Sequence, residues 1–191
     1  GMLVLFGCRA DTNGGGGSGG GGEVDGGGGG GGGTEMTIQE VHDINLPAGT
    51  TVNVRGVVVT AVDTYGGRTG GFYVAEPDGG EYSGVFVFTS NPSISASLAV
   101  GDLVDIESAR KDEFALSEDT TGRTLTELSD GGSMSVTKVG TAELPAAKEL
   151  NPWEIQSDEE AEKWEGVLVK FPNVAVLSKP RNVSQSDPTL K

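Results

Sequence analysis

Several residue types on which protein chemistry often depends are scarce in this chain of 191 residues. It has one cysteine and one histidine, so it cannot close an internal disulfide and lacks the ligands of a usual zinc site. Only 13 lysines and arginines accompany 28 aspartates and glutamates, and the formal net charge is −15. Such a surface repels nucleic-acid phosphates and anionic lipid unless a local basic patch overcomes the field. No uninterrupted apolar stretch is long enough to span a bilayer.

Catalytic groups are equally sparse. The sequence offers no His, Asp, Glu and Asn constellation typical of a metal-assisted hydrolase, and its glycine tract lacks the lysine of a phosphate-binding loop. The single histidine, His42, lies in a polar segment, where we expect a solvated loop residue. We therefore expect no enzymatic activity, no cofactor and no small-molecule substrate. Acidic loops at residues 76–81 and 118–119 leave calcium binding open, although ordinary acidic turns explain them as well.

What the chain has in excess is glycine, 33 residues in all. Residues 14–33 are nearly all glycine, and glycine has the most backbone entropy to lose and no side chain to bury. This composition predicts a flexible tether, and we expect residues 9–50 to form a disordered, glycine-rich linker. A tail without any role is the alternative.

The residues before the tether form a short apolar run that ends in Leu5-Phe6-Gly7-Cys8. This resembles the end of a bacterial lipoprotein signal peptide, with its lipobox, over residues 1–8. The resemblance implies that Cys8 is a lipid anchor and that the protein is attached to the outer face of a bacterial membrane in the cell envelope, or secreted. An ordinary unpaired thiol at Cys8 is the alternative.

From residue 51 the pattern changes to short β-branched and aromatic segments separated by Gly and Asp turns. Gly56 lies inside the first and longest segment, which predicts a bulge or a sharp bend. Residues 91–99 read as a loop. Without helices between the strands, residues 51–141 predict an all-β fold, a small antiparallel β-barrel or sandwich. The expected strands are residues 51–62, 71–76, 84–89, 103–109, 124–128 and 134–139.

Residues 142–191 follow a different pattern, a short helix and a trailing strand. Ser157 and Glu160 form a capping box that predicts a helix ending near Trp164, followed by strands at 166–171 and 174–177. Residues 165–169 repeat the charged-Gly-Val-apolar-Val order of residues 55–59. The repeat predicts either the start of a truncated second barrel or a chance similarity.

Five phrases in order suggest a family. They are Val54-Arg55-Gly56-Val57-Val58, Gly71-Phe72-Tyr73-Val74, Gly84-Val85-Phe86-Val87-Phe88, Val100-Gly101-Asp102-Leu103-Val104 and Leu125-Thr126-Glu127-Leu128. Together they resemble an oligonucleotide/oligosaccharide-binding (OB) fold. They are most similar to the non-catalytic OB-like domain that precedes the catalytic domain of bacterial extracellular nucleases. The resemblance covers about residues 51–177, and the nuclease catalytic domain of that family has no counterpart in it.

The resemblance also implies where a ligand would bind. OB folds bind nucleic acid or sugar on the face of their second and third strands, with bases stacked on aromatics and phosphates near cations. The candidate residues are the aromatics Tyr65, Phe72, Tyr73, Phe86 and Phe88 and the cations Arg55, Arg68, Arg110 and Lys111. The alternative is that these aromatics are mostly core.

We therefore expect a non-catalytic, membrane-tethered OB-fold binding module, for which single-stranded nucleic acid is one candidate ligand. The N-terminal fragment of a secreted metal-dependent nuclease and a glycan- or protein-binding surface module are the alternatives. A barrel that only stiffens the chain and binds nothing is a third.

Overall fold

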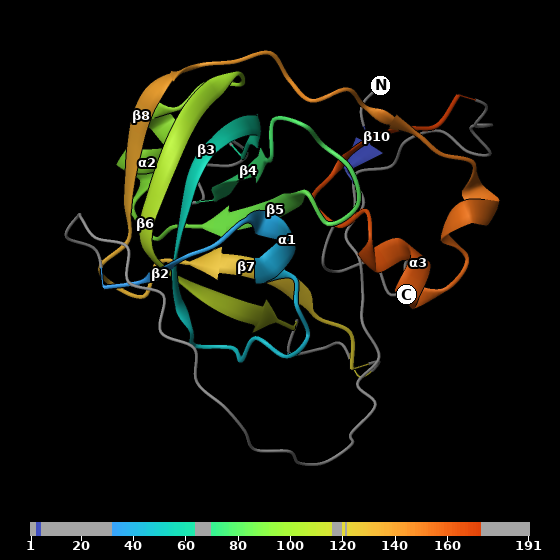
Figure 1. The fold of residues 1–191 in the computed structure, drawn as a ribbon, viewed down its shortest axis with the longest axis horizontal. Helices are drawn as coiled ribbons and strands as arrows, with labels where there is room; N and C mark the ends of the chain where they lie inside the picture. Colours follow the sequence, from blue (N-terminus) through green and yellow to red (C-terminus); the bar gives the residue numbers. More distant parts are fainter. Residues whose placement is uncertain (1–2, 5–31, 64–69, 116–119, 121, 173–191) are drawn as a thin grey trace, which may run out of the picture.

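A closed ring of five strands forms the centre of the fold (Figure 1). The structure is a computed structural model, which describes residues 3–4, 32–63, 70–115, 120 and 122–172. The five strands are β3 (Thr51–Val62), β4 (Gly71–Ala75), β5 (Gly84–Phe88), β6 (Asp102–Phe114) and β7 (Leu125–Ser129). They follow the order β3-β4-β5-β7-β6, and pairing of β6 with β3 closes the ring. All neighbours are antiparallel except β5 and β7, which are parallel.

This arrangement is an OB-like β-barrel, and it confirms the fold class predicted from the sequence. The long first strand serves two neighbours because it bends. Gly56 has a φ of +64°, and the pairing of β3 with β6 shifts register between Val54 and Val57. Beyond this bulge, β3 continues along β4 from Val58 to Val62.

The barrel core comes from one face of each strand and from two helices. Valines of β3, β4 and β5 fill it, together with Val104 and Ile106 of β6. The helices are α1 (Ile38–Val41), which lies near β5, and α2 (Pro92–Ser97), which lies near β4. Both contribute apolar side chains to the core.

The two helices correct two expectations. Residues 34–50 are not a disordered linker, because β2 (Thr34–Glu35) pairs with β3 and α1 buries Ile38 and Val41 completely. A capping box between Thr37 and Glu40 starts α1. Residues 91–99 are not only a loop, because Asn91 caps α2 and Pro92 occupies its first turn.

The remaining strand of the main sheet is β8 (Ser135–Thr141), which pairs with β6 on the outside of the ring. After it, residues 142–172, here called the C-terminal segment, hold β9 (Lys148–Glu149), the 3-10 helix η2 (Pro152–Ile155), α3 (Asp158–Glu162) and β10 (Leu168–Lys170). The predicted Ser157–Glu160 capping box does start α3. β10 pairs with β9 and with β1 (Leu3–Val4). The strand predicted at 174–177 lies outside the described residues.

The C-terminal segment has its own small core and a close contact with the barrel. Leu150, Trp164, Val167 and Val169 pack together separately from the barrel core. The backbone N–H of Tyr82, in the β4–β5 turn, donates to the carbonyl of Lys163 at 2.7 Å. Within the described ranges, no helix has the length and apolar character needed to cross a membrane.

Candidate ligand-binding face

Strands β4 and β5 correspond to the second and third strands of the barrel, where OB folds bind their ligands. Phe72 and Val74 point inward and are fully buried in the core. Phe72 is therefore a core residue, and its predicted role in stacking is wrong. The opposite side of β4 and β5 carries Tyr73, Phe86 and Phe88, which we call the aromatic face.

The aromatic face is compact and only partly open to solvent, because Tyr73 is buried at 8% exposure and Phe86 is half-buried, so Tyr73 offers little surface for the predicted stacking. Tyr73 and Phe86 are directly paired across the strands, with ring centroids 4.9 Å apart and planes tilted by 49°. A Cβ placed on Gly71 would lie 2.7 Å from Cζ of Phe86, so the Phe86 ring lies over this glycine, close against the sheet. Phe88 is 40% exposed and is the most accessible of the three rings.

Polar side chains continue this face across β7 and β6. Phe86 is in register with Glu127, and Phe88 is in register with Ser129, which in turn pairs with Arg110. Burial, and to a smaller extent Asp112, raises the pKa of Glu127 to about 7. Near neutral pH this carboxyl group therefore exists in both protonation states, one that donates a hydrogen bond and one that only accepts.

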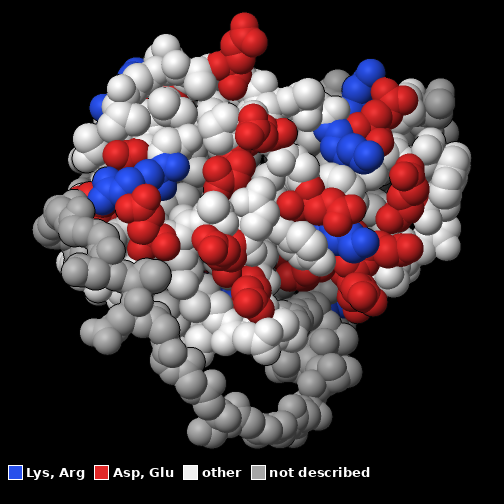
Figure 2. Space-filling model, viewed as in Figure 1, with Lys and Arg blue, Asp and Glu red and all other residues white. Residues whose placement is uncertain are grey.

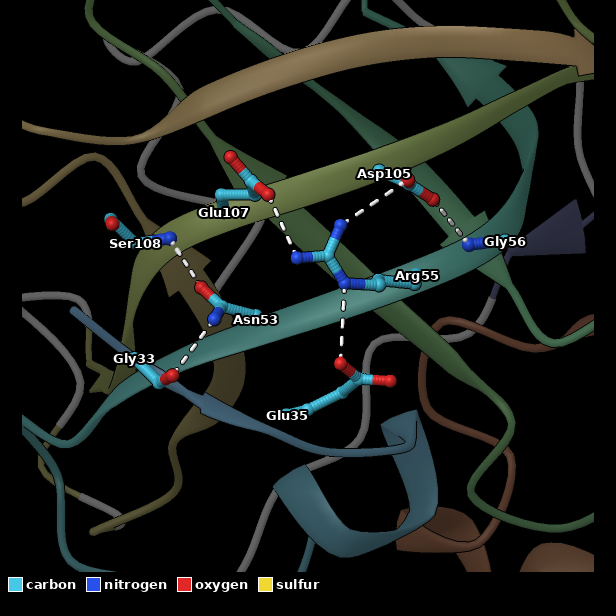
Figure 3. Close-up of polar contacts among 8 residues, drawn as sticks. All are labelled: Gly33, Glu35, Asn53, Arg55, Gly56, Asp105, Glu107 and Ser108. Atoms are coloured by element: carbon cyan, nitrogen blue, oxygen red, sulfur yellow. Dashed lines mark hydrogen bonds and ion pairs between the residues drawn. The ribbon is translucent and has the colours of Figure 1, made fainter. Parts of the chain in front are cut away.

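Arg55, one of the predicted cations, lies on β3 away from the aromatic face and is surrounded by carboxylates (Figure 3). Its guanidinium contacts Glu107 at 2.8 Å, Glu35 at 3.3 Å and Asp105 at 3.4 Å. Asp105 also accepts the backbone N–H of Gly56 at 2.8 Å, which ties the cluster to the bulge. With three carboxylates around one cation, this cluster repels a phosphate rather than attracting it.

The other two predicted cations that the structure describes, Lys111 and Arg110, also have ion-pair partners. Lys111 is 2% exposed, and its ammonium donates to the carbonyls of Asp43 and Leu46 and contacts Glu113 at 3.3 Å. Lys111 is therefore a structural residue, and its predicted contact with nucleic acid is wrong. Arg110 is accessible but pairs with Asp112 at 2.8 Å. Figure 2 shows acidic side chains spread over the visible face, with basic ones gathered at a few points.

Three predicted residues lie outside the described part of the chain. They are Cys8, Tyr65 and Arg68.

His42 differs from its expected role as a solvated loop residue. It is buried, and Nε2–H donates to the carbonyl of Gly84 at 2.8 Å, which ties the end of α1 to β5. Burial lowers the pKa of His42, so the ring stays neutral at physiological pH. The surroundings are those of a structural histidine.

Of the two acidic loops considered for calcium, residues 118–119 lie outside the described part of the chain, and residues 76–81 show no metal site. Glu76 accepts the backbone N–H of Ile38 at 2.8 Å and so serves the first turn of α1. Within the described ranges, no group of three or more His, Cys, Asp or Glu side chains is placed to hold a metal ion.

Two buried acids were missed by the sequence analysis, Glu127 on β7 and Glu165 in the C-terminal segment. Glu165 is 1% exposed, and burial, with repulsion from Glu162, raises its pKa to about 9. Apolar periodicity carries no signal for either residue, because charged residues are expected at exposed positions.

Comparisons with known proteins add little to this geometry. No family model matches the sequence, and no curated protein matches it either. Among solved structures, the chain is similar to an aspartyl-tRNA synthetase from Leishmania major Friedlin, with a TM-score of 0.40 and 16% identity. The match covers 58% of this chain and 21% of that chain. A likeness this low carries no argument about function, so the description as an OB-like barrel rests on the strand order.

Proposed function

We propose that this protein is a non-catalytic module that binds an uncharged oligosaccharide on the aromatic face of its OB-like barrel. One observation carries the proposal. Phe88 is 40% exposed on the outer side of β5 and the half-buried ring of Phe86 lies beside it on the same strand, whereas Tyr73, Glu127 and Ser129 are buried. Every predicted cation that the structure describes is already in contact with a carboxylate.

The chemistry of these groups suits a sugar. The apolar face of a pyranose ring packs against an aromatic ring, and a small number of polar groups then fix its orientation. Glu127 is only 6% exposed, so the polar partners for sugar hydroxyls are the accessible side chains of Arg110 and Asp112 on β6. An uncharged ligand also avoids the repulsion that a net charge of −15 imposes on a polyanion.

Single-stranded nucleic acid is the second candidate, and one observation favours it. Phe88 and Arg110 lie on the same level of the sheet, separated only by Ser129. A base stacked on Phe88 would place a neighbouring phosphate within reach of Arg110, as in other single-strand binding sites. Binding would then require Arg110 to exchange its partner Asp112 for the phosphate.

We further propose that the module works outside the cytoplasm, attached to the membrane by a lipid on Cys8. The support is the lipobox-like sequence Leu5-Phe6-Gly7-Cys8 and the glycine-rich tract after it. Cleavage before Cys8 would remove β1 and with it one partner of β10. Replacing Cys8 by Ser should move the protein from the membrane fraction to the soluble fraction, and unchanged membrane association would contradict the anchor.

The resemblance to the OB-like domain of extracellular nucleases supports a related role. In that case the module would hold a polymer for a catalytic domain supplied elsewhere.

Calorimetric titration of the chain with cellohexaose, beside fluorescence anisotropy with labelled oligo(dT), tests the ligand. We expect the neutral sugar to bind, and Phe88→Ala to weaken its binding at least about tenfold, or about 1.4 kcal/mol. Val100→Ala is the matched control, because Val100 is an exposed apolar residue in the turn before β6 and not one of the three aromatic residues.

Tight, salt-sensitive binding of oligo(dT) without sugar binding would favour the nucleic-acid candidate instead. Sugar binding that is unaffected by Phe88→Ala would place the ligand elsewhere.

A further inference from the structure

A hollow of about 340 Å³ lies where the C-terminal segment meets the β4–β5 turn, and it shares no residue with the aromatic face. Both tryptophans of the chain, Trp153 and Trp164, line it. Trp153 is 65% exposed, whereas Trp164 is buried with the ammonium of Lys148 5.5 Å from its ring centroid. The volume falls at the small end of ligand pockets, which are roughly 300–1,000 Å³.

Two lysines that line this hollow, Lys148 and Lys163, differ from the other cations of the described residues. Neither forms an ion pair within the part of the chain that the structure describes. All other described lysines and arginines do: Arg55, Arg110, Lys111, Arg123, Lys138 and Lys170. In a chain with a net charge of −15, two cations without a carboxylate partner at one hollow are exceptional.

Three carboxylates also line the hollow, those of Glu81, Glu154 and Glu160. Glu154 accepts the backbone N–H of Asn151 at 2.7 Å, and Glu160 accepts that of Ser157 at 3.2 Å. The two ammonium groups and the carboxylate of Glu81 are therefore the charged groups left for a ligand. Because carboxylates outnumber ammonium groups by three to two, the hollow disfavours a polyanion and suits a ligand that combines hydroxyl donors with a single negative charge.

We propose that this hollow binds an acidic sugar residue, a pyranose ring that carries one carboxylate. The ring packs on the exposed indole of Trp153, which offers a flat apolar surface. The carboxylate binds the ammonium groups of Lys148 and Lys163, and the hydroxyls donate to the carboxylates that line the hollow. The assignment stands on residues separate from those of the aromatic face.

Tryptophan fluorescence of the full chain, titrated with galacturonic acid, tests the assignment directly because both indoles line the hollow. We expect a saturable change in emission that weakens as salt is added. Lys148→Gln and Lys163→Gln should each weaken binding about tenfold, as expected for loss of one charged hydrogen bond. Lys170→Gln is the control, because it removes the same charge. Lys170 pairs with exposed Glu149 and does not line the hollow, so this variant should leave binding unchanged.

Several results would overturn the proposal. They are no emission change, an equal change with neutral galactose, an unaltered affinity in both lysine variants, and binding of adenosine monophosphate but not of the acidic sugar. Phe88→Ala should not alter this binding, although it weakens binding at the aromatic face. The two sites can therefore fail independently.

Discussion

The barrel and the C-terminal segment contain the same short phrase in two different settings. Arg55-Gly56-Val57 lies in β3, and Glu165-Gly166-Val167 leads into β10. The two glycines have nearly the same backbone, with φ of +64° and +65°. Their surroundings differ, because a Cβ on Gly56 would meet nothing within 4 Å, whereas one on Gly166 would lie 2.8 Å from the backbone of Gly84.

The charged residues before these glycines differ even more. Arg55 lies near the surface among three carboxylates, whereas Glu165 is buried and has a pKa of about 9. The comparison teaches that the local phrase sets the backbone conformation, while the side-chain environment depends on strands far away in the sequence.

The largest difference should come from replacing the glycines. Gly166→Ala combines a left-handed backbone with a clash against Gly84, so we expect a loss of about 3 kcal/mol or more. Gly56→Ala has only the backbone penalty, about 1 kcal/mol. Urea unfolding followed by tryptophan fluorescence reports the C-terminal segment, and far-UV circular dichroism reports the barrel.

Gly84→Ala is the control for the contact itself. Its Cβ would collide with the backbone of Gly166, and its φ is not positive, so it isolates the steric part of the effect. Equal losses for Gly56→Ala and Gly166→Ala would show that the contact between the glycines contributes nothing.

The next effect concerns the charge of Glu165. Its pKa rises from 4.5 to about 9 on folding, so the folded state binds the proton more tightly. Its contribution to stability is therefore complete below pH 4.5 and declines as the pH rises toward 9, by up to about 1.4 kcal/mol per pH unit.

Glu165→Gln mimics the protonated form and should flatten this decline. As the pH rises from 7 to 9, we expect the free energy of unfolding of the variant to increase by about 2 kcal/mol relative to that of the wild type. Unfolding curves at pH 5, 7 and 9 measure this difference.

Glu127→Gln is the comparison. The pKa of Glu127 reaches only about 7, so the loss of stability with rising pH that this residue causes should end near pH 7. Parallel pH profiles for the wild type and Glu165→Gln would rule out a neutral buried acid at position 165.

The smallest effect should come from Arg55. Arg55→Gln leaves Glu35, Asp105 and Glu107 without their shared cation, so the melting temperature should fall slightly. Because the remaining repulsion is screened by salt, the deficit should shrink between low salt and 0.5 M NaCl. Arg123→Gln, which removes a single exposed pair with Asp158, is the control and should show a smaller salt dependence.

The strands were predictable because they are rich in β-branched residues, many of which point into the barrel core. β3, for example, spans the predicted residues 51–62. The helix α3 was predictable from its capping box. Thr37 and Glu40 form the same capping-box motif, which is equally recognisable in the sequence and would have predicted α1.

The candidate site was less predictable. Every residue of β4 is buried, so alternation alone does not separate Phe72 in the core from Tyr73 on the outer face. Lys111 is buried because the carbonyls of Asp43 and Leu46 receive its ammonium. These partners are far away in sequence, as are the carboxylates around Arg55, and pairings of this kind depend on strand register rather than on local pattern.

The closure of the ring also sets an order of events during synthesis. Thr51 pairs with Arg110, and Phe86 pairs with Glu127, so the barrel cannot close until β7 has left the ribosome. Until then β3, β4 and β5 lack the strands that complete the ring, and contacts so distant in sequence form slowly. During this interval the valine-rich strands are exposed and prone to aggregate.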